Sequence, residues 1–263
     1  MLSEQNKNMQ TPPSELKQKD PQKRAKLIML RQKIAPWEGH RSSTLKGYSL
    51  LPPLDSFLKE NLQSGLHEIA GTDLDQEEAI LPALFALALM RQREGDFAWI
   101  SNRQNLYAPG LAAWGIDPGR GIFIATRSNQ ESLWAFEEVL RSGSVGAAIA
   151  ELDKLSLTAS RRLQLAAEKS GIAGLALRRW RLGGEAYQGQ AQPIAALTRW
   201  RVHANPSHIS ARGISLNIDL WRQKGGHPFT WQVEFYRGKF HEIPSSLAQP
   251  FSHGSLAPQQ RHA

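Results

Sequence analysis

Five short apolar runs recur along the middle of the chain, separated by stretches with the spacing of amphipathic helices. The runs are LHEIA (66–70), FAWIS (97–101), GIFIAT (121–126), VGAAIAEL (145–152) and AGLALRRW (173–180). Continuous apolar strands that alternate with helices are typical of a parallel sheet covered by helices. The sequence therefore predicts an α/β fold with a mostly parallel, twisted sheet.

The pattern changes after residue 181. The stretch RLGGEAYQGQAQP has turn residues and no periodicity, which indicates a mobile loop. Three runs of alternating apolar and polar residues follow, AALTRWRVHA, ISLNIDLWR and TWQVEFY, and they predict antiparallel strands at the C-terminal end of the domain.

The two ends of the chain differ in composition from its centre. Residues 1–55 are predicted to form a flexible, disordered basic tail, because residues 1–20 are polar and offer almost nothing to bury. Within this tail, PQKRAKLIMLRQKIA (about 21–35) predicts a short basic amphipathic helix that ends at Pro36. Residues 244–263 have the composition of a second tail, which leaves 56–243 as the folded domain.

The composition limits which binding partners the protein can have and which cellular compartment it occupies. The chain has no cysteine, so disulfides and thiolate metal sites are excluded, and its eight histidines lack ligand spacing and are expected mostly at the surface. The longest apolar run, AILPALFALALM, is too short to span a bilayer, and the N-terminus lacks the apolar core of a signal peptide. We expect a cytoplasmic protein without membrane contact or metal. The net charge of +8 favours a polyanionic partner such as nucleic acid.

The junction after the first apolar run, GTDLDQEEA (71–79), lies where α/β proteins place a phosphate-binding loop. Its spacing fits G-x-x-x-x-G-K-[ST] only at Gly71, because Gln76 replaces the second glycine and Glu77 replaces the lysine. The carboxylates of this stretch would repel phosphate groups and instead stabilise the start of the following helix. They belong to Asp73, Asp75, Glu77 and Glu78. The residues alone favour an ordinary acidic helix start, with no nucleotide cofactor.

Other residues allow two interpretations each. Glu151 and Asp153 end the fourth apolar run, where sites of α/β proteins gather, but a metal or water-activating role is the weaker interpretation beside the altered loop. Tryptophans and arginines alternate in the C-terminal half, a pattern that either stacks bases or forms a strand core, and the core is favoured. These tryptophans are Trp180, Trp200, Trp221 and Trp231. Thr158 is the expected cap of the helix that follows the fourth run.

Several segments share one register with a known family. They are GLHEIAGTDLDQEEA, REGDFAWIS, LYAPGLAAWGIDPGRGIFI, ESLWAFEEVLRSGSVGAAIAELDKLSLTASRRLQLAAEKSG and AALTRWRV. These segments, from about residue 60 to 240, strongly resemble the ImuA family of bacterial damage-inducible mutagenesis proteins, which are related to RecA and SulA. The resemblance implies a RecA-like core and a role beside ImuB and an error-prone DNA polymerase in SOS-induced translesion synthesis.

The resemblance also assigns positions. Gly71 matches the first glycine of the RecA phosphate loop, and Arg103 falls near the catalytic glutamate. Glu151 matches the metal-associated aspartate, and Arg178 falls near the residue that senses the γ-phosphate. The nucleotide site is therefore expected to be degenerate, and the chain is expected not to be an enzyme.

Two further interfaces follow from the same alignment. The loop 181–195 matches the second DNA-binding loop of RecA, which predicts contacts with single-stranded DNA. The arginines at its entry are Arg178, Arg179 and Arg181. Arg222 and Lys224 match the basic pair that RecA places across a subunit interface, which predicts contact with a RecA filament. The alternatives are a SulA-like division inhibitor that acts on FtsZ, an NTPase with an unconventional loop, and a plain DNA-binding module.

Overall fold

The computed structural model describes the central part of the chain. The described residues are 54, 62, 64–72, 80–91, 93–103, 106–113, 116–179, 192–208, 210–224, 226–236 and 239–243. The predicted tails 1–55 and 244–263, apart from residue 54, and the basic helix at 21–35 lie outside them.

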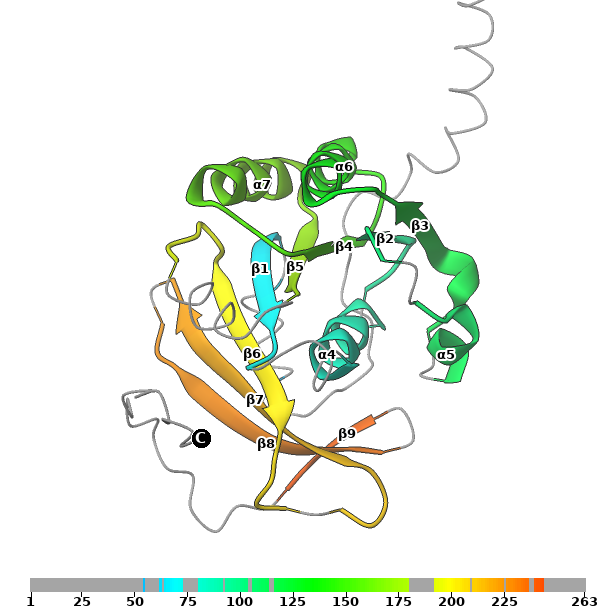
Figure 1. The fold of residues 1–263 in the computed structure, drawn as a ribbon, viewed down its shortest axis with the longest axis vertical. Coiled ribbons are helices and arrows are strands. Elements are labelled where there is room, and N and C mark those ends of the chain that lie inside the picture. The colour runs from blue at the N-terminus through cyan, green and yellow to red at the C-terminus, as the bar shows by residue number, and fades with distance from the viewer. Residues whose placement is uncertain are drawn as a thin grey trace, which may run out of the picture. The chain divides into compact units, whose positions relative to one another are not determined.

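The described strands form one sheet in the order β3-β2-β4-β5-β1-β6-β7-β8-β9 (Figure 1). The strands from β3 to β6 in this order run parallel, and β6 to β9 are antiparallel. In chain order the strands are β1 (Gly65–Ala70), β2 (Phe97–Ser101), β3 (Gly121–Ala125), β4 (Ala147–Leu152), β5 (Ala173–Arg178), β6 (Thr198–Ala204), β7 (Ile214–Gln223), β8 (Phe229–Tyr236) and β9 (Lys239–Glu242). The predicted α/β fold, mostly parallel with antiparallel strands at its C-terminal end, is confirmed.

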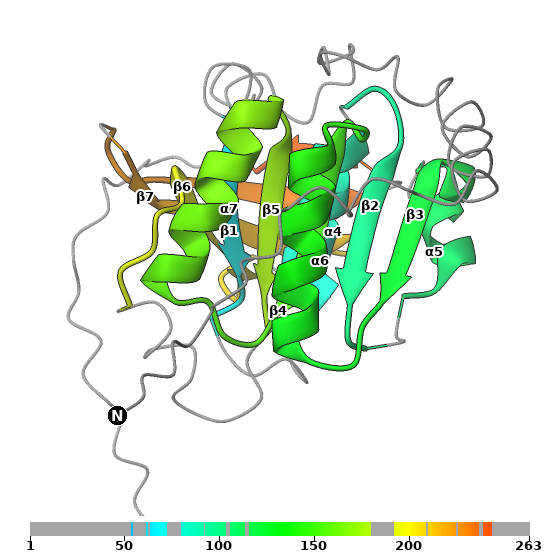
Figure 2. The same ribbon diagram turned by 90° about the horizontal axis from the view of Figure 1, so that it is seen from above.

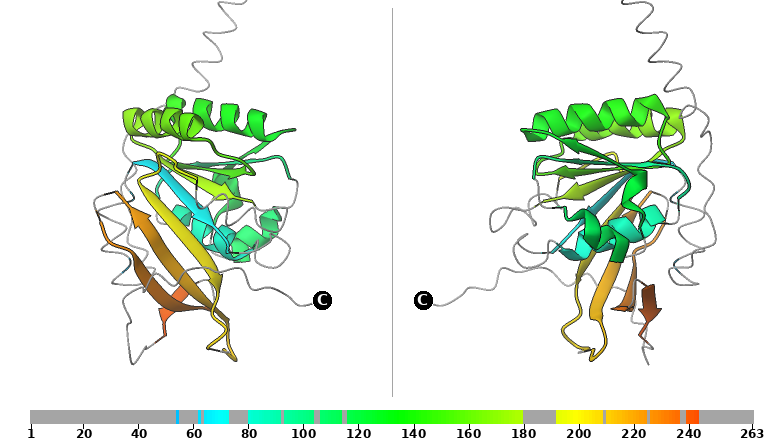
Figure 3. Two further views of the ribbon diagram at one scale, coloured as in Figure 1. Left: turned by 60° about the vertical axis from the view of Figure 1, so that its left-hand side comes forward. Right: turned by 90° about the vertical axis from the view of Figure 1, so that its right-hand side faces the viewer.

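Helices cover both faces of the parallel part of the sheet, as Figures 2 and 3 show. Helices α4 (Ile80–Arg91) and α5 (Ala108–Ala113) lie on one face, and α6 (Asn129–Ser142) and α7 (Leu157–Ser170) lie on the other. Alternate residues of each strand therefore enter two separate cores, so that Ile149 packs on the α4 side and Ala148 on the α6 and α7 side. None of the described helices is long and apolar enough to cross a membrane.

The caps of α7 correct one expectation from the sequence. Ser156, not Thr158, is the N-cap, and its hydroxyl accepts a hydrogen bond from Ala159 N at 3.2 Å. Thr158 already lies within the first turn, because Leu157 is the first helical residue. The helix ends at Gly171, whose φ of 76° is the left-handed conformation that glycine adopts without strain.

Strand β6 corrects a second expectation, because it is antiparallel on one side only. It runs antiparallel to β7 but parallel to β1, with His67 paired to Thr198 and Ala70 to Arg201. A parallel neighbour requires a long crossover, and the connection from β5 to β6 is long enough to bring the chain back to the same end of the sheet. Strand β6 thus joins the parallel half of the sheet to the antiparallel half.

Candidate functional site

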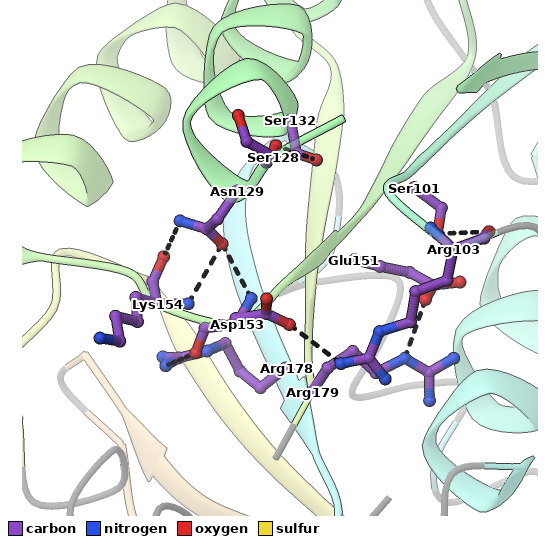
Figure 4. Close-up of polar contacts among 10 residues, drawn as sticks. All are labelled: Ser101, Arg103, Ser128, Asn129, Ser132, Glu151, Asp153, Lys154, Arg178 and Arg179. Carbon is purple, nitrogen blue, oxygen red and sulfur yellow. Dashed lines mark hydrogen bonds and ion pairs between the residues drawn. The ribbon is translucent and has the colours of Figure 1, made fainter. Parts of the chain in front are cut away.

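Charged side chains gather where β2, β4 and β5 end (Figure 4). Glu151 is the second-last residue of β4, and Asp153 directly follows that strand. Arg103 lies just after β2, and Arg179 lies just after β5. Parallel strands present their carboxyl ends at one edge of a sheet, which is the edge where α/β proteins build their sites. The fold therefore brings these residues to one edge of the sheet.

The Glu151 carboxylate is buried and hydrogen-bonded by neighbouring side chains. Trp99 Nε1 donates to Oε1 at 3.0 Å, and Arg179 Nε donates to Oε2 at 3.0 Å. The Glu151 side chain is only 1% exposed. Each carboxylate oxygen thus accepts a hydrogen bond from a buried side chain of the same chain. Within the described residues, no three or more histidine, aspartate or glutamate side chains gather in a way that could hold a metal ion.

A second buried cluster, which the sequence interpretation missed, centres on Glu68 of β1. Arg178 Nη1 donates to Glu68 Oε1 at 2.9 Å, and Arg199 Nε of β6 donates to Oε2. The side chains of Arg178 and Glu68 are each 2% exposed, and that of Arg199 is 1% exposed. Burial lowers the pKa of Arg178 below its usual value, and Glu68 opposes that shift. The available signal was the presence of charged residues inside three otherwise apolar or alternating runs: Glu68 in LHEIA, and two arginines each in AGLALRRW and AALTRWRVHA.

A third pair ties the loops together. Arg103 Nη2 lies 3.0 Å from Asp153 Oδ1 (Figure 4). Asn129, the first residue of α6, accepts hydrogen bonds through Oδ1 from Asp153 N at 2.8 Å and Lys154 N at 3.1 Å, and its Nδ2 donates to Lys154 O at 3.0 Å. The start of α6 is thereby fixed to the loop between β4 and α7.

These three clusters fill the site with internal charge pairs. The carboxylates of Glu68, Glu151 and Asp153 each bind at least one arginine of the same chain. In a nucleotide site of this fold, the corresponding carboxylate would face a metal ion and phosphates. Here each of these carboxylates is paired with an arginine of the same chain, and the pairs link neighbouring strands of the sheet.

The predicted DNA contacts are placed differently from the expectation. Arg178 and Arg179 are both buried, and each is ion-paired with a glutamate, so neither guanidinium lies at an exposed loop mouth. Their contact with DNA stays a prediction that requires these pairs to open. Arg181 lies outside the described residues.

Of the predicted nucleotide loop, only the first two residues, 71 and 72, belong to the described part of the chain. Gly71 directly follows β1 and is buried. The acidic residues and Gln76 all lie in 73–79, outside the described part of the chain. The interpretation of this stretch as a degenerate phosphate loop stays a prediction.

The basic pair Arg222 and Lys224 lies at the other end of the parallel strands. Both residues are exposed at the end of β7, which is paired with the start of β6: Arg222 is the register partner of Arg199, and Lys224 N donates to Leu197 O at 2.9 Å. Glu151 lies at the carboxyl end of β4, whereas this pair lies beside the amino end of β6. Within one chain, the predicted nucleotide site around Glu151 and the basic pair therefore lie at opposite ends of the parallel strands.

Three of the four tryptophans named from the sequence lie within the described residues and pack inside the fold, whereas Trp180 lies outside them. Trp200 and Trp231 are buried in the core on the α4 side with ring centroids 5.9 Å apart, and Phe85 of α4 lies 5.3 Å from Trp200. Trp221 lies on the other face of the sheet, with the guanidinium carbon of Arg199 4.3 Å from its ring centroid. These contacts agree with the core interpretation, since the arginine stacks within the chain.

One histidine departs from the expected surface position. His67 of β1 is fully buried, and its Nδ1 lies 2.8 Å from Thr198 Oγ1. Burial, with a smaller contribution from the positive charge of Arg93, lowers the pKa of His67 from 6.5 to about 3. The imidazole is therefore neutral at physiological pH.

Comparisons with known proteins agree with this architecture. No family model matches the chain. Protein ImuA of Caulobacter vibrioides (strain NA1000 / CB15N) is 36% identical over 182 residues, which is 65% of this chain and 74% of that protein. The protein of the same name from strain ATCC 19089 / CIP 103742 / CB 15 matches equally well.

Two solved structures match parts of the chain, and one of them supports its fold. The crystal structure of the RadB recombinase superimposes with a TM-score of 0.51 at 12% identity, over 73% of this chain and 96% of the other. That likeness supports a RecA-like fold and nothing more specific. SulA from Pseudomonas aeruginosa gives a TM-score of 0.39 at 20% identity, over 43% of this chain and 97% of the other.

Proposed function

Because this chain belongs to the ImuA family, we propose that it is a non-catalytic, RecA-like accessory protein of SOS-induced mutagenesis. In this proposal it acts with ImuB and an error-prone DNA polymerase in translesion synthesis, and it contributes binding surfaces in place of ATP hydrolysis. The family match supports the mutagenesis role, and the internally paired charges support the absence of catalysis.

The observation that carries the non-catalytic part is the environment of Glu151. A hydrolytic site of this fold needs a carboxylate that can reach a metal ion directly or through water. Exposing Glu151 would break its hydrogen bonds from Trp99 and Arg179 and leave a buried guanidinium without its carboxylate. Separating such a buried pair costs about 3–5 kcal/mol, which would have to come out of the binding energy of any nucleotide.

Equilibrium dialysis of the full chain with ATP and magnesium tests this part directly. We expect no binding at micromolar ATP, because carboxylates replace the lysine of the loop at 71–79 and because Glu151 is engaged within the chain. A dissociation constant in the micromolar range would contradict the proposal. The double variant Gln76→Gly plus Glu77→Lys is the matched control: weak binding is expected to return, without turnover.

Mutagenesis in cells separates accessory from catalytic function. A strain that lacks the endogenous protein would be complemented with the wild-type chain or with the double variant Glu151→Gln plus Arg179→Met, which removes both charges of the pair together. If the chain is an accessory protein, damage-induced mutation frequency is retained as long as the variant folds to a similar level. Loss of function in a variant of unchanged thermal stability would favour the NTPase alternative.

We further propose that Arg222 and Lys224 contact a RecA filament. Both side chains are exposed, and the net charge of the chain is +8, so the pair is available to the phosphates of a nucleotide held by a neighbouring subunit. A RecA filament-growth assay on single-stranded DNA is the measurement. Substoichiometric wild-type chain is expected to stop growth, and the folded variant Arg222→Ala plus Lys224→Ala is expected not to.

A further inference from the structure

The outermost strand on one side of the sheet, β3, presents an apolar edge among the described residues. It pairs only with β2 among the described strands, in a continuous register from Phe97 with Gly121 to Ser101 with Ala125 (Figure 2). Its sequence, GIFIA, contains no charge and no proline, and its pairing has no bulge, although these are the devices that keep edge strands from pairing with other chains. Ile122 is 39% exposed and Phe123 is 45% exposed, so apolar surface continues on both faces of the edge.

The backbone of β3 is ready to accept another strand. Thr126 N donates to Ser101 O at 2.9 Å, so the peptide groups of Thr126 and of every second residue before it face β2. The alternate residues Gly121, Phe123 and Ala125 therefore direct their backbone polar groups away from the sheet. The N–H of Gly121 is already bound to Pro118 O, which leaves its carbonyl and both groups of Phe123 and Ala125 on the outer side.

The order of residues in β3 is nearly the same in both directions. An antiparallel pairing of two copies centred on Phe123 would place each Ile122 opposite Ile124 and each Gly121 opposite Ala125. Every pair is apolar, and the outward-facing residues fall in the hydrogen-bonded positions of the ladder. Arg120, just before the strand, donates from Nε to Gly95 O at 2.8 Å and from Nη2 to Arg93 O at 2.7 Å, so its charge is turned into its own chain.

From these features we propose that β3 is a homodimer interface. Two copies of this chain pair their β3 strands antiparallel about a two-fold axis at Phe123, which joins the two sheets into one. Cross-strand neighbours point to the same face, so the two Phe123 rings meet on the face that carries α4 and α5. This self-complementary arrangement is what a two-fold interface requires, since the same patch serves both subunits.

A cavity beside the strand gives the second phenylalanine a place to pack. It has a volume of about 300 Å³ and is lined by residues that include Trp99, Leu106 and Phe123. Phe123 itself is held on this face by an edge-to-face contact with Phe97, with ring centroids 6.0 Å apart. Aromatic rings that meet over apolar walls contribute more than their buried area alone.

Sedimentation velocity of the full chain over about 1 to 100 µM tests the proposal. We expect a reversible monomer–dimer equilibrium with a dissociation constant on the order of micromolar, because a short strand pair is at the small end of interface sizes. The variants Phe123→Lys and Phe123→Glu are each expected to be monomeric, since the two-fold axis would place like charges opposite each other. An equimolar mixture of the two is expected to restore a heterodimer.

Control variants distinguish this interface from other exposed apolar residues. Trp134 is 63% exposed on α6 and is not part of the strand pairing, so Trp134→Lys is expected to dimerise like the wild type. If Phe123→Lys does not fold by circular dichroism, Ile122→Lys provides the second probe and is also expected to be monomeric. A wild-type chain that stays monomeric at 100 µM would overturn the proposal. It would also be overturned by a folded Phe123→Lys that dimerises normally, or by folded charge variants that do not combine.

Discussion

Replacing Glu68 by glutamine is expected to lower the free energy of unfolding by about 3–5 kcal/mol. The carboxylate binds Arg178 and Arg199 in a setting where no side chain of the three is more than 2% exposed. Glutamine has nearly the same volume but carries no charge, so two buried guanidinium groups would lose the negative charge that they share. Because domains are stable by only about 5–15 kcal/mol, the loss is large enough to measure easily.

Urea unfolding followed by tryptophan fluorescence is the assay, since Trp200 lies in the core and directly follows Arg199 on β6. With a slope of about 2 kcal/mol per molar urea, the midpoint should fall by roughly 2 M. The matched control is Glu138→Gln on α6, where Glu138 and Arg141 form a half-exposed pair with Oε1 and Nη1 3.2 Å apart. That substitution is expected to change stability by less than about 0.5 kcal/mol.

A loss below about 1 kcal/mol for Glu68→Gln, with an unchanged slope, would refute this reasoning, because buried guanidinium groups would then need no counter-ion. A triple variant, Glu68→Leu with Arg178→Met and Arg199→Met, removes all charges together. It is expected to be close to the wild type or more stable, since apolar residues of similar size often replace a buried ion cluster without loss.

Two other predictions concern the buried histidine His67 and the N-cap residue of α7, Ser156. The pKa of His67 is about 3 when folded and 6.5 when unfolded, so between these values the unfolded chain binds the extra proton and stability falls as the pH is lowered. Urea unfolding should show about 2 kcal/mol more loss between pH 7 and pH 5 for the wild type than for His67→Asn, and equal losses would show that His67 is protonated in the native state. At the start of α7, Ser156→Ala should cost about 1 kcal/mol in the same assay and Thr158→Ala less than about 0.5 kcal/mol, and the reverse order would restore Thr158 as the cap.

The elements of the parallel sheet were predictable because each strand is an apolar run of the right length between helical patterns. The direction of β6 was not, since the alternation in TRWRVHA reports which side chains are buried and contains no information on the direction of the neighbouring strand. The cap of α7 was missed for a related reason. Ser156 and Thr158 are both good caps, and only the position of the first helical residue decides between them.

The candidate site was predictable in its location but not in its chemistry. Parallel strands end at one edge, and the resemblance placed Arg103 after the second run and Glu151 at the end of the fourth, so both belong to that edge. The pairing of Glu68 with Arg199 joins residues 131 positions apart and depends on β1 lying beside β6, which the sequence does not reveal. A charge inside a buried strand predicts that some partner exists, but the partner follows only from the strand order.

The position of β1 in the sheet affects how the chain folds during synthesis. Both strands that pair with β1 come much later in the sequence. Thr198, the hydrogen-bond partner of His67, lies 131 residues further along the chain. At roughly 5–20 residues per second, the ribosome needs on the order of ten seconds to supply that partner. Throughout this interval β1 remains a nascent segment without its native neighbours, and the polar His67 and Glu68 at its centre reduce its tendency to associate with other chains. The charge that later anchors the finished sheet thus also protects its first strand on the ribosome.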